Sequence, residues 1–168
     1  MEHSSARPAD GIETVIHTYG SILYRLCFVM LGNESDAEDA VQETLIRYLQ
    51  KAPQFKDANH EKAWLITVAS NRCRDLLRVR KRHPQIDSEN LQGISACPSD
   101  SGILEALMTL PEKFRLVLTL YYVEEYPMEE IARIIGKTPS AVKMRLRKGR
   151  KLLRKSTERS TCKWNLEN

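Results

Sequence analysis

The apolar residues of this chain recur every three or four positions in almost every segment, which is the spacing of an α-helix and not the alternation of a β-strand. Residues 10–31 are typical, with one stripe formed by Ile12, Val15, Ile16, Tyr19, Ile22, Leu23 and Leu26. Proline and glycine interrupt the pattern at intervals that suit helices of ordinary length. The sequence therefore predicts an all-α fold.

The N-terminal part of the chain predicts three helices. The first covers about residues 10–31 and ends at Gly32, and the second begins at a capping box formed by Ser35 and Glu38. This second helix runs to about residue 51, where Pro53 stops it, with Val41, Leu45 and Tyr48 on its apolar side. The third covers about residues 60–82, with Leu65, Val68, Ala69 and Leu76 supplying its core face.

The C-terminal part predicts four shorter helices, at about residues 103–110, 112–123, 128–135 and 139–155. Pro111 and Pro127 stand where a proline would open a helix as its first residue. Residues 84–101 are polar, contain proline, glycine and serine, and carry no apolar stripe. We therefore expect two small helical modules, residues 1–83 and 102–168, joined by a flexible linker over residues 84–101.

Charge is strongly segregated along the chain, although the net formal charge is only +4. Residues 1–61 carry 5 basic and 10 acidic side chains, whereas residues 62–83 carry 7 basic and 1 acidic. Residues 84–101 carry 3 acidic side chains and no basic one, and residues 102–168 carry 14 basic and 8 acidic. One basic block near the end of each module suggests two places that could hold a polyanion, although solvated helix faces would have the same composition.

Residues 128–153 have the pattern of a helix-turn-helix. Gly136 falls at the turn, Thr138 is a good N-cap, and Pro139 suits the first position of the following helix. In that helix Val142, Leu146, Gly149 and Leu153 share an inward face, while Ser140, Lys143, Met144, Arg147 and Lys151 point outward and Arg145 and Lys148 flank them. Residues 137–155 contain nine basic and no acidic residues, which favours DNA binding over an ordinary helical hairpin with a basic surface.

The second predicted helix carries a charged face. Asp36, Asp39, Glu43 and Arg47 lie on one side of it, with Gln42 at the edge. Acidic residues near a helix N-terminus are favoured by the helix dipole, which explains the first part of this pattern but not Glu43 and Arg47. A docking face for a protein and a solvated helix surface both remain open from the pattern alone.

The third predicted helix has a polar and aromatic side formed by Trp64, Thr67, Asn71, Arg74 and Arg78. An indole can stack on a base, an amide can read a base edge, and arginines can hold the backbone. The residues therefore suggest a surface for single-stranded nucleic acid. A tryptophan at such a position can equally be a core residue.

Several classes of function lack support in the sequence. Cys27, Cys73, Cys97 and Cys162 are far apart and form no CxxC or Cys/His motif, so we expect no metal site, no cofactor and a reduced, cytoplasmic protein. The longest strictly apolar run has six residues, and residues 1–10 lack the apolar region of a secretory signal, so we expect no membrane-embedded segment. No catalytic constellation or small-molecule site is visible, which argues against an enzyme.

Four stretches of this sequence resemble the extracytoplasmic-function (ECF) sigma factors of bacterial RNA polymerase. They are DAEDAVQET (36–44), AWLITVASNRCRDLL (63–77), LPEKFRLVLTLYYVEEY (110–126) and IARIIGKTPSAVKMRLRKGRKLL (131–153). The resemblance covers nearly all of residues 12–155. It implies that residues 12–83 melt and capture the −10 promoter element and that residues 102–155 read the −35 element.

The resemblance also assigns roles to single residues. It implies that core polymerase is contacted by Asp36, Asp39, Gln42, Glu43 and Arg47. Contact with the −10 element, including a pocket for a flipped base, falls to Phe55, Asn59, Trp64, Thr67, Asn71, Arg74 and Arg78. Contact with the −35 element falls to Thr138, Ser140, Lys143, Met144, Arg145, Arg147 and Lys148. Members of this family are often held inactive by an anti-sigma factor, whereas residues 156–168 match no family role.

Two other functions remain as alternatives. A stand-alone helix-turn-helix repressor or activator would need to dimerise on palindromic sites, and neither heptads nor a ligand-binding domain is visible. A recombinase or nuclease would need catalytic residues that the pattern does not supply. We therefore predict a sigma factor that directs core RNA polymerase to promoter DNA.

Overall fold

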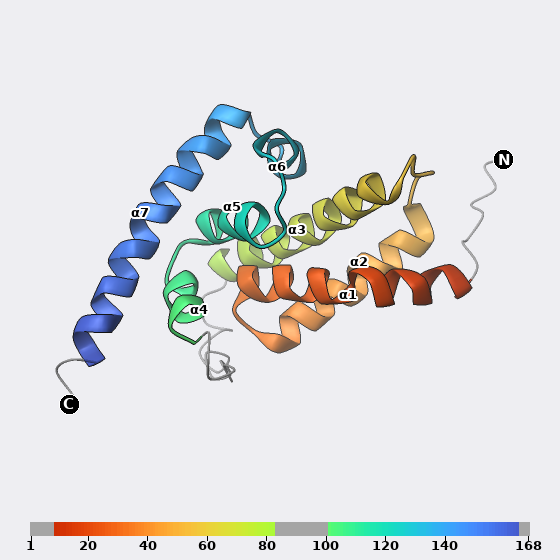
Figure 1. Ribbon diagram of the computed structural model, residues 1–168. Coiled ribbons are helices and arrows are strands. Elements are labelled where there is room, and N and C mark those ends of the chain that lie inside the picture. The colour runs from red at the N-terminus through yellow and green to blue at the C-terminus, as the bar shows by residue number, and fades with distance from the viewer. Residues whose placement is uncertain (1–8, 83–100, 165–168) are drawn as a thin grey trace. The chain divides into compact units, whose positions relative to one another are not determined.

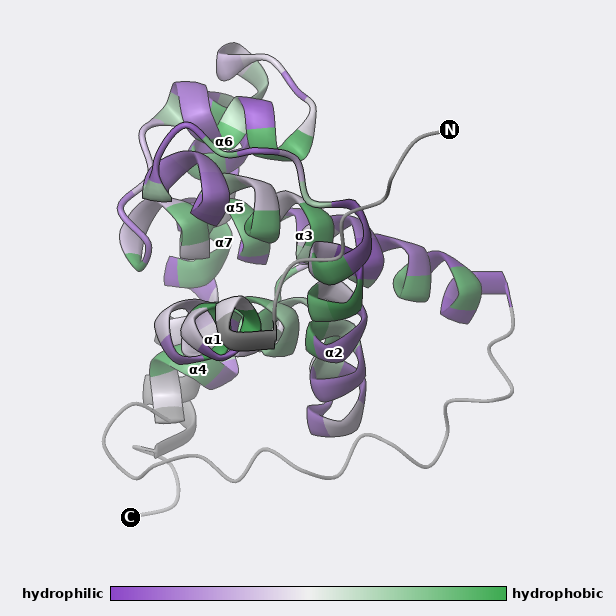
Figure 2. Ribbon diagram, turned by 90° about the vertical axis from the view of Figure 1, so that its right-hand side faces the viewer, coloured by the Kyte–Doolittle hydropathy of each residue, from purple (hydrophilic) through white to green (hydrophobic). Residues whose placement is uncertain are grey.

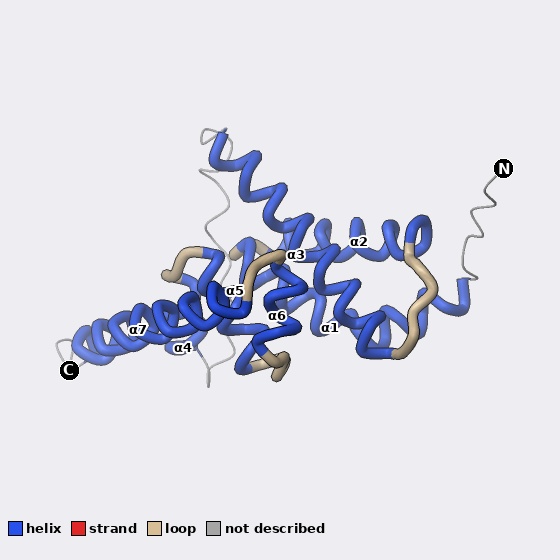
Figure 3. Tube along the Cα trace, turned by 90° about the horizontal axis from the view of Figure 1, so that it is seen from above, coloured by secondary structure: helices blue, strands red, loops and turns tan. Residues whose placement is uncertain are grey.

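The computed structural model describes residues 9–82 and 101–164, and both ranges consist of α-helices joined by short loops (Figure 1). Figure 3 shows helix and loop, and no strand, over these residues. The chain divides into two compact units, residues 1–92 and 93–168. The predicted all-α fold with two helical modules is confirmed. The predicted linker lies outside the described residues except for Ser101, which opens a helix.

The first unit consists of three helices, α1 (Ala9–Leu31), α2 (Glu34–Lys51) and α3 (Ala58–Arg82), which pack against one another. Its core contains Leu23, Leu26 and Met30 from α1 and Leu65 and Ile66 from α3, all at most 1% exposed. Figure 2 shows hydrophobic and hydrophilic segments alternating along α2 and α3, as expected for helices with one buried side. Burial of these apolar side chains is the main force that holds the three helices together.

The buried faces of α2 and α3 differ from the predicted stripes. On α2, Val41 and Leu45 are only half-buried, and the core side is formed by Ala37, Ala40, Thr44 and Tyr48. On α3, Val68 and Leu76 are likewise half-buried, and the buried residues are Leu65, Ile66, Ala69, Ser70 and Cys73. Each helix contacts two neighbours at once, so its buried face is wider than one apolar stripe and takes in small and polar residues.

The predicted capping box at Ser35 and Glu38 is wrong, because α2 starts two residues earlier. Gly32 has a φ of 73°, a left-handed conformation that ends α1 at little steric cost. Asn33 then adopts an extended conformation, and its Oδ1 accepts a hydrogen bond from the Asp36 N–H at 3.0 Å. Asn33 is therefore the N-cap of α2. Similarly, α3 begins at Ala58 because Asp57 Oδ1 accepts a hydrogen bond from the His60 N–H at 2.7 Å.

Helix α1 is long and apolar enough between Gly11 and Leu31 to cross a bilayer, judged by length and composition alone. This is weak evidence for a membrane span, because the core helix of a folded domain meets the same criterion. In this structure α1 packs on α2 and α3, and Leu23 and Cys27 in its C-terminal half are completely buried. The apolar character of α1 is thus accounted for by the core of the first unit.

The second unit consists of α4 (Ser101–Met108), α5 (Glu112–Tyr122), α6 (Met128–Ile135) and α7 (Pro139–Trp164). The three shorter helices lie along α7, with α6 at its N-terminal end (Figure 1). Near the other end, the hydroxyl groups of Thr109 and Ser156 are hydrogen-bonded at 2.9 Å. Helix α7 extends to Trp164, well past the predicted end at residue 155.

Helix α5 approaches α7 closely at Gly149. A Cβ atom at this position would lie 3.2 Å from Leu118 Cδ1 and 3.4 Å from Phe114 Cβ. The missing side chain therefore lets α5 pack directly against the backbone of α7. The prolines also sit one residue earlier than predicted, since Pro111 and Pro127 are the N-cap residues of α5 and α6 and not their first helical residues.

Candidate nucleic-acid and protein interfaces

The predicted helix-turn-helix is present in α6, α7 and the turn between them. Gly136 adopts a left-handed conformation with φ 63° and ψ 45°, and the Lys137 N–H donates to the Ala132 carbonyl at 2.9 Å. This bonding closes α6 in the manner of a Schellman motif. Thr138 Oγ1 then accepts a hydrogen bond from the Ala141 N–H at 3.2 Å, so Thr138 caps α7. The turn chemistry read from the sequence is confirmed at both of these residues.

Helix α7 separates an apolar face from a basic one. Val142, Leu146 and Gly149 are buried against the rest of the second unit. The residues predicted to contact DNA lie on the other side: Ser140, Lys143, Met144, Arg147 and Lys148 are exposed, and Arg145 is half-buried. Thr138 differs from them because its hydroxyl oxygen is engaged in the helix cap. The exposed face of α7 can therefore present cations and a few base-reading side chains to one groove of a duplex.

Arg150 is a further basic residue on the exposed side of α7 that the sequence-based prediction did not single out. Its Nη1 donates a hydrogen bond to the Tyr122 hydroxyl at 3.1 Å, and both side chains remain exposed. A guanidinium held in this way is oriented before any ligand arrives, which lowers the entropic cost of binding a phosphate. The spacing Lys143, Arg147, Arg150 along one helix side is the signal that could have identified it.

Phe55 is the centre of an aromatic cluster in the first unit. Its ring centroid lies 6.1 Å from that of Tyr48 on α2, 5.4 Å from that of His60 and 5.8 Å from that of Trp64, both on α3. The Tyr48 and Trp64 rings are 6.2 Å apart. The structure thus brings together two residues of the predicted base pocket, Phe55 and Trp64, and adds two that the prediction did not include.

Glu61 ties this cluster to all three helices of the first unit. Its carboxylate accepts hydrogen bonds from the Tyr48 hydroxyl and, at 3.4 Å, from the Tyr19 hydroxyl on α1. The Tyr19 hydroxyl also lies 3.3 Å from the Ala58 carbonyl. Burial raises the pKa of Tyr19, and the negative charge of Glu61 adds to this shift. Glu61 was missed by sequence reasoning because its partners lie 13 and 42 residues away.

The polar side of α3 continues from the aromatic cluster. Asn59, Asn71 and Arg78 are exposed, and Arg78 pairs with Asp75 at 3.2 Å. Two other residues predicted to contact DNA are partly engaged within the helix. Thr67 Oγ1 donates to the Ala63 carbonyl at 2.8 Å, and Arg74 Nε donates to the Ser70 carbonyl at 3.2 Å. Trp64, Asn71 and Arg78 follow one another at intervals of seven residues and therefore lie along one side of α3.

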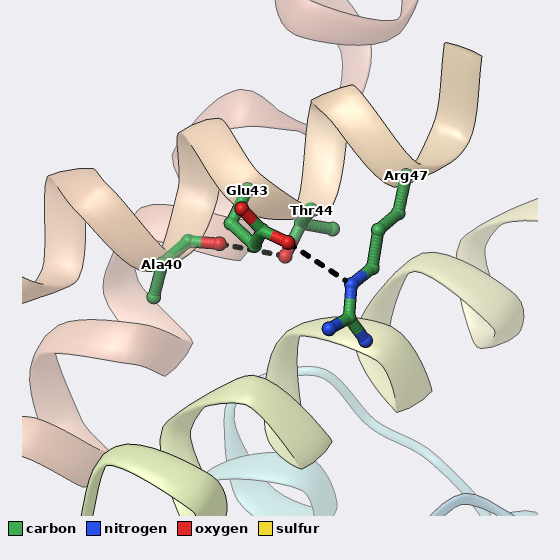
Figure 4. Close-up of polar contacts among 4 residues, drawn as sticks. All are labelled: Ala40, Glu43, Thr44 and Arg47. Atoms are coloured by element: carbon green, nitrogen blue, oxygen red, sulfur yellow. Dashed lines mark hydrogen bonds and ion pairs between the residues drawn. The ribbon is translucent and has the colours of Figure 1, made fainter. Parts of the chain in front are cut away.

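The predicted docking face on α2 contains residues in three different situations. Asp39 and Gln42 are exposed, and Glu43 accepts a hydrogen bond from Arg47 Nε at 3.3 Å along the helix surface (Figure 4). Beside them the buried hydroxyl of Thr44 donates to the Ala40 carbonyl at 2.7 Å (Figure 4). The side chains of Arg47 and Glu43 are 42% and 38% exposed, so both charges remain accessible to a partner. Such a pair stabilises a helix by only about 0.3–0.5 kcal/mol.

Asp36 is the exception on this face, because its carboxylate pairs with Arg80 near the end of α3. Arg80 Nη1 also donates to the carbonyl of Leu31, the last residue of α1, at 3.3 Å. A cation at the C-terminal end of one helix and an anion at the N-terminal end of the next both suit the helix dipoles. Asp36 and Arg80 therefore join the ends of three helices.

Cys27 and Cys73 are free thiols in the core of the first unit, as expected for buried cysteines without a disulfide. A hydrogen bond with Cys27 raises the pKa of the Cys73 thiol, and burial raises it further. A thiol held in its protonated form is a poor nucleophile and a poor metal ligand. Within residues 9–82 and 101–164, no group of three or more His, Cys, Asp or Glu side chains is placed to hold a metal ion.

Comparison with known proteins connects these two units with transcription. Residues 15–83 match the family Sigma-70 region 2, and residues 101–153 match Sigma-70 region 4. The chain is 30% identical over 165 residues to the ECF RNA polymerase sigma factor SigW of Bacillus subtilis, an alignment that covers 87% of this chain and 88% of SigW. It is also 30% identical over 145 residues to SigV of the same organism, covering 84% of this chain and 87% of SigV.

The same fold is found in a solved sigma-factor structure. The sigma factor RpoE of Bartonella quintana, in complex with the anti-sigma factor NepR, superposes with a TM-score of 0.74 at 21% identity and covers 89% of this chain and 98% of that one. At this level of identity the likeness concerns the fold alone. The regions matched in sequence contain all the candidate residues described above.

Proposed function

The chain belongs to the ECF type of sigma-70 family sigma factors, which direct transcription initiation, and we propose which of its parts contact core polymerase and which contact each promoter element. We propose that residues 1–83 bind core RNA polymerase and capture the −10 element, that residues 102–168 read the −35 element, and that residues 84–101 link them. The observation that carries the proposal is the capped helix-turn-helix whose outer face carries basic and no acidic side chains, in the same chain as a separate unit with an aromatic cluster.

Core polymerase would dock on the exposed part of α2. Asp39, Glu43 and Arg47 supply accessible charges, and Gln42 supplies an exposed amide. Asp36 supports the face from within the unit through Arg80. Charges at the rim of an interface mainly raise the association rate and fix the register. The polymerase performs the nucleotide chemistry, and this chain selects the site without being an enzyme itself.

The −10 element would be captured beside the aromatic cluster. Extruding one base from a duplex costs a few kcal/mol, and stacking on an aromatic ring returns about 1–3 kcal/mol per base. Phe55 and Trp64 offer such rings, and Asn59 and Asn71 offer hydrogen bonds to base edges. Arg74 and Arg78 would lie along the path of the bound DNA strand. Thr67 lies between Trp64 and Asn71 along α3.

The −35 element would be read by α7. Lys143, Arg145, Arg147 and Lys148 provide phosphate contacts, whereas Ser140 and Met144 lie on the turns of the helix that enter the groove first. Thr138 sets the start of the helix. Each unit alone binds DNA weakly and with a steep dependence on salt, but on one polymerase the second contact becomes intramolecular and the affinities multiply.

Partners follow from these surfaces. We infer that the chain works in the cytoplasm with core polymerase and promoter DNA, without a cofactor or small-molecule substrate. The related sigma factor solved with NepR supports including an anti-sigma factor among the partners. A stand-alone helix-turn-helix regulator is not favoured, since both matched regions are sigma-factor regions.

A run-off transcription assay with bacterial core RNA polymerase tests the proposal. We expect a promoter-specific transcript only when this protein is added, and a sharp loss of transcript with Asn71→Ala or with Arg147→Ala. The two variants should still bind core polymerase in a pull-down, because neither residue lies on α2. Tight and specific binding of the free protein to duplex DNA, without any effect on polymerase, would instead identify a stand-alone regulator.

A further inference from the structure

Met144 is the most exposed large hydrophobic side chain of the described residues, at 66% of its full accessibility. Its position on α7 is unusual for an apolar residue. With a helical rotation of about 100° per residue, Met144 points roughly 200° away from the buried Val142 and thus almost directly away from the core of the second unit. Packing within this unit gives no reason for a methionine at this place.

The surroundings of Met144 identify the type of partner. Lys143, Arg147 and Lys148 are exposed next to it, and residues 137–155 contain no acidic side chain. Such a surface attracts a polyanionic partner and repels a basic partner. Met144 is also the sixth residue of α7, within the first two turns, which are the part of a recognition helix that meets base edges in the major groove.

The chemistry of the Met144 side chain then favours one of the four bases as its contact. A thioether side chain cannot form the donor and acceptor pairs that distinguish guanine, adenine and cytosine in the major groove. The apolar group displayed there is the C5 methyl of thymine. Against the other bases, Met144 would cover polar atoms without satisfying them, which costs binding energy and adds discrimination. Methionine is flexible enough to reach such a methyl group without a fixed rotamer.

We propose that Met144 is a specificity-determining residue that selects a thymine in the −35 element by contact with its C5 methyl group. The neighbouring cations supply affinity to the phosphates, which carries no sequence information, and Met144 supplies preference at one position. This inference rests on the proposed function, because it requires α7 to enter the major groove of the −35 element.

The first experiment determines whether Met144 sets a base preference. Holoenzyme made from the full chain and core polymerase selects active promoters from a library randomised at the −35 hexamer. We expect the wild-type holoenzyme to enrich thymine, on one strand, at one position, and Met144→Gln to lose the enrichment there while keeping the other positions. Met144→Leu, which retains an apolar side chain, should keep it. Identical hexamers from the wild type and Met144→Gln would overturn the proposal.

The second experiment isolates the methyl group. In the selected promoter the thymine is replaced by deoxyuridine, which lacks only that methyl. Wild-type holoenzyme should bind this promoter about fourfold more weakly, the loss expected for one methyl group removed from an apolar contact. Met144→Gln holoenzyme should bind both promoters equally. A deoxyuridine effect of the same size in both proteins, or none in the wild type, would contradict the proposal.

Lys151→Ala provides the matched control, because Lys151 is exposed on the same side of α7, two turns further along. It should weaken binding to all hexamers alike and leave the thymine preference unchanged. The outcomes also separate this inference from the proposed function. If wild-type holoenzyme enriches no hexamer at all, the assignment of α7 to the −35 element fails. If it enriches a hexamer that does not depend on residue 144, only the role of Met144 fails.

Discussion

Arg80, two residues before the end of α3, forms an ion pair with Asp36 in the first turn of α2. The two side chains are only 24% and 26% exposed, and Arg80 also donates to the last carbonyl of α1. The pair therefore fixes the corner at which all three helices of the first unit meet. It also gives Asp36 a structural role that its neighbours on the same face of α2 do not share.

Loss of either partner should destabilise the first unit. We expect Arg80→Met and Asp36→Asn each to cost about 1–2 kcal/mol, between the values for exposed and fully buried pairs. The double variant should cost less than the sum, because the second change removes a charge that is already unpaired. Hydrogen exchange of the amides in α1, α2 and α3 measures these differences. Strictly additive effects would show that the two residues do not interact.

Asp39→Asn is the matched control for Asp36→Asn. Asp39 is exposed on the same helix, so its replacement should change stability by less than about 0.5 kcal/mol. If α2 docks on core polymerase, Asp39→Asn should nevertheless weaken that binding and make it less sensitive to salt. Asp36→Asn should weaken binding only to the extent that it loosens the fold. Equal loss of stability in both variants would argue against this distinction.

The Asp36–Arg80 pair also shows what the sequence could not predict. Its partners are 44 positions apart, and each has a local explanation, a helix N-terminus for Asp36 and a basic run for Arg80. Likewise, Glu61 is read as an ordinary acidic residue in a first turn until Tyr19 and Tyr48 are seen around it. Interactions of this kind depend on how helices cross, which helical periodicity does not specify.

Local features were predicted more successfully. The left-handed turn at Gly136, the cap at Thr138 and the inward face of Val142 and Leu146 each depend on residues within one or two turns of helix. The buried side of α2 was predicted poorly for the opposite reason. Ala40 and Thr44 are only weakly apolar, and they are buried because small side chains let α2 approach its two neighbours, not because of their hydrophobicity.

Tyr19 should make the first unit sensitive to alkaline pH. Its pKa in the folded state is raised above the ordinary value of 10.0, chiefly by burial and then by Glu61. Below pH 10 its contribution to stability is complete. As the pH rises above 10, the unfolded chain loses this proton before the folded chain does, so the free energy of unfolding falls until the folded pKa is passed.

Chemical denaturation of the wild type between pH 9 and pH 11 measures this slope. We expect Tyr19→Phe, which has no ionisable hydroxyl, to flatten the slope. Glu61→Gln should flatten it partly, because the negative charge that adds to the shift is gone while the burial remains. If Tyr19→Phe left the alkaline slope unchanged, another group would be responsible for it.

The contact between Gly149 and Leu118 predicts a steric effect in the second unit. A Cβ at Gly149 would lie within 3.2–3.3 Å of the Leu118 side chain, and the larger side chain of Gly149→Val must displace it. Overpacking of a buried contact typically costs about 1–3 kcal/mol. Thermal unfolding of the full chain should show this loss. Leu118→Ala, destabilising by itself, should make Gly149→Val less harmful, and the absence of such rescue would place the strain elsewhere.

The aromatic cluster predicts a defect in promoter opening that is separate from polymerase binding. Phe55 and Trp64 lie 5.8 Å apart, centroid to centroid, and Asn71 is exposed about two helical turns beyond Trp64 on α3. If a base stacks here, Trp64→Ala should reduce the affinity of holoenzyme for a forked promoter with unpaired −10 bases by about 5- to 150-fold, as removal of one stacking partner worth about 1–3 kcal/mol implies. Affinity for core polymerase and for a −35 duplex should stay unchanged.

Asn71→Ala should impair the same step without disturbing the rings. Equal losses on forked and fully duplex promoters would show that the cluster only supports the fold.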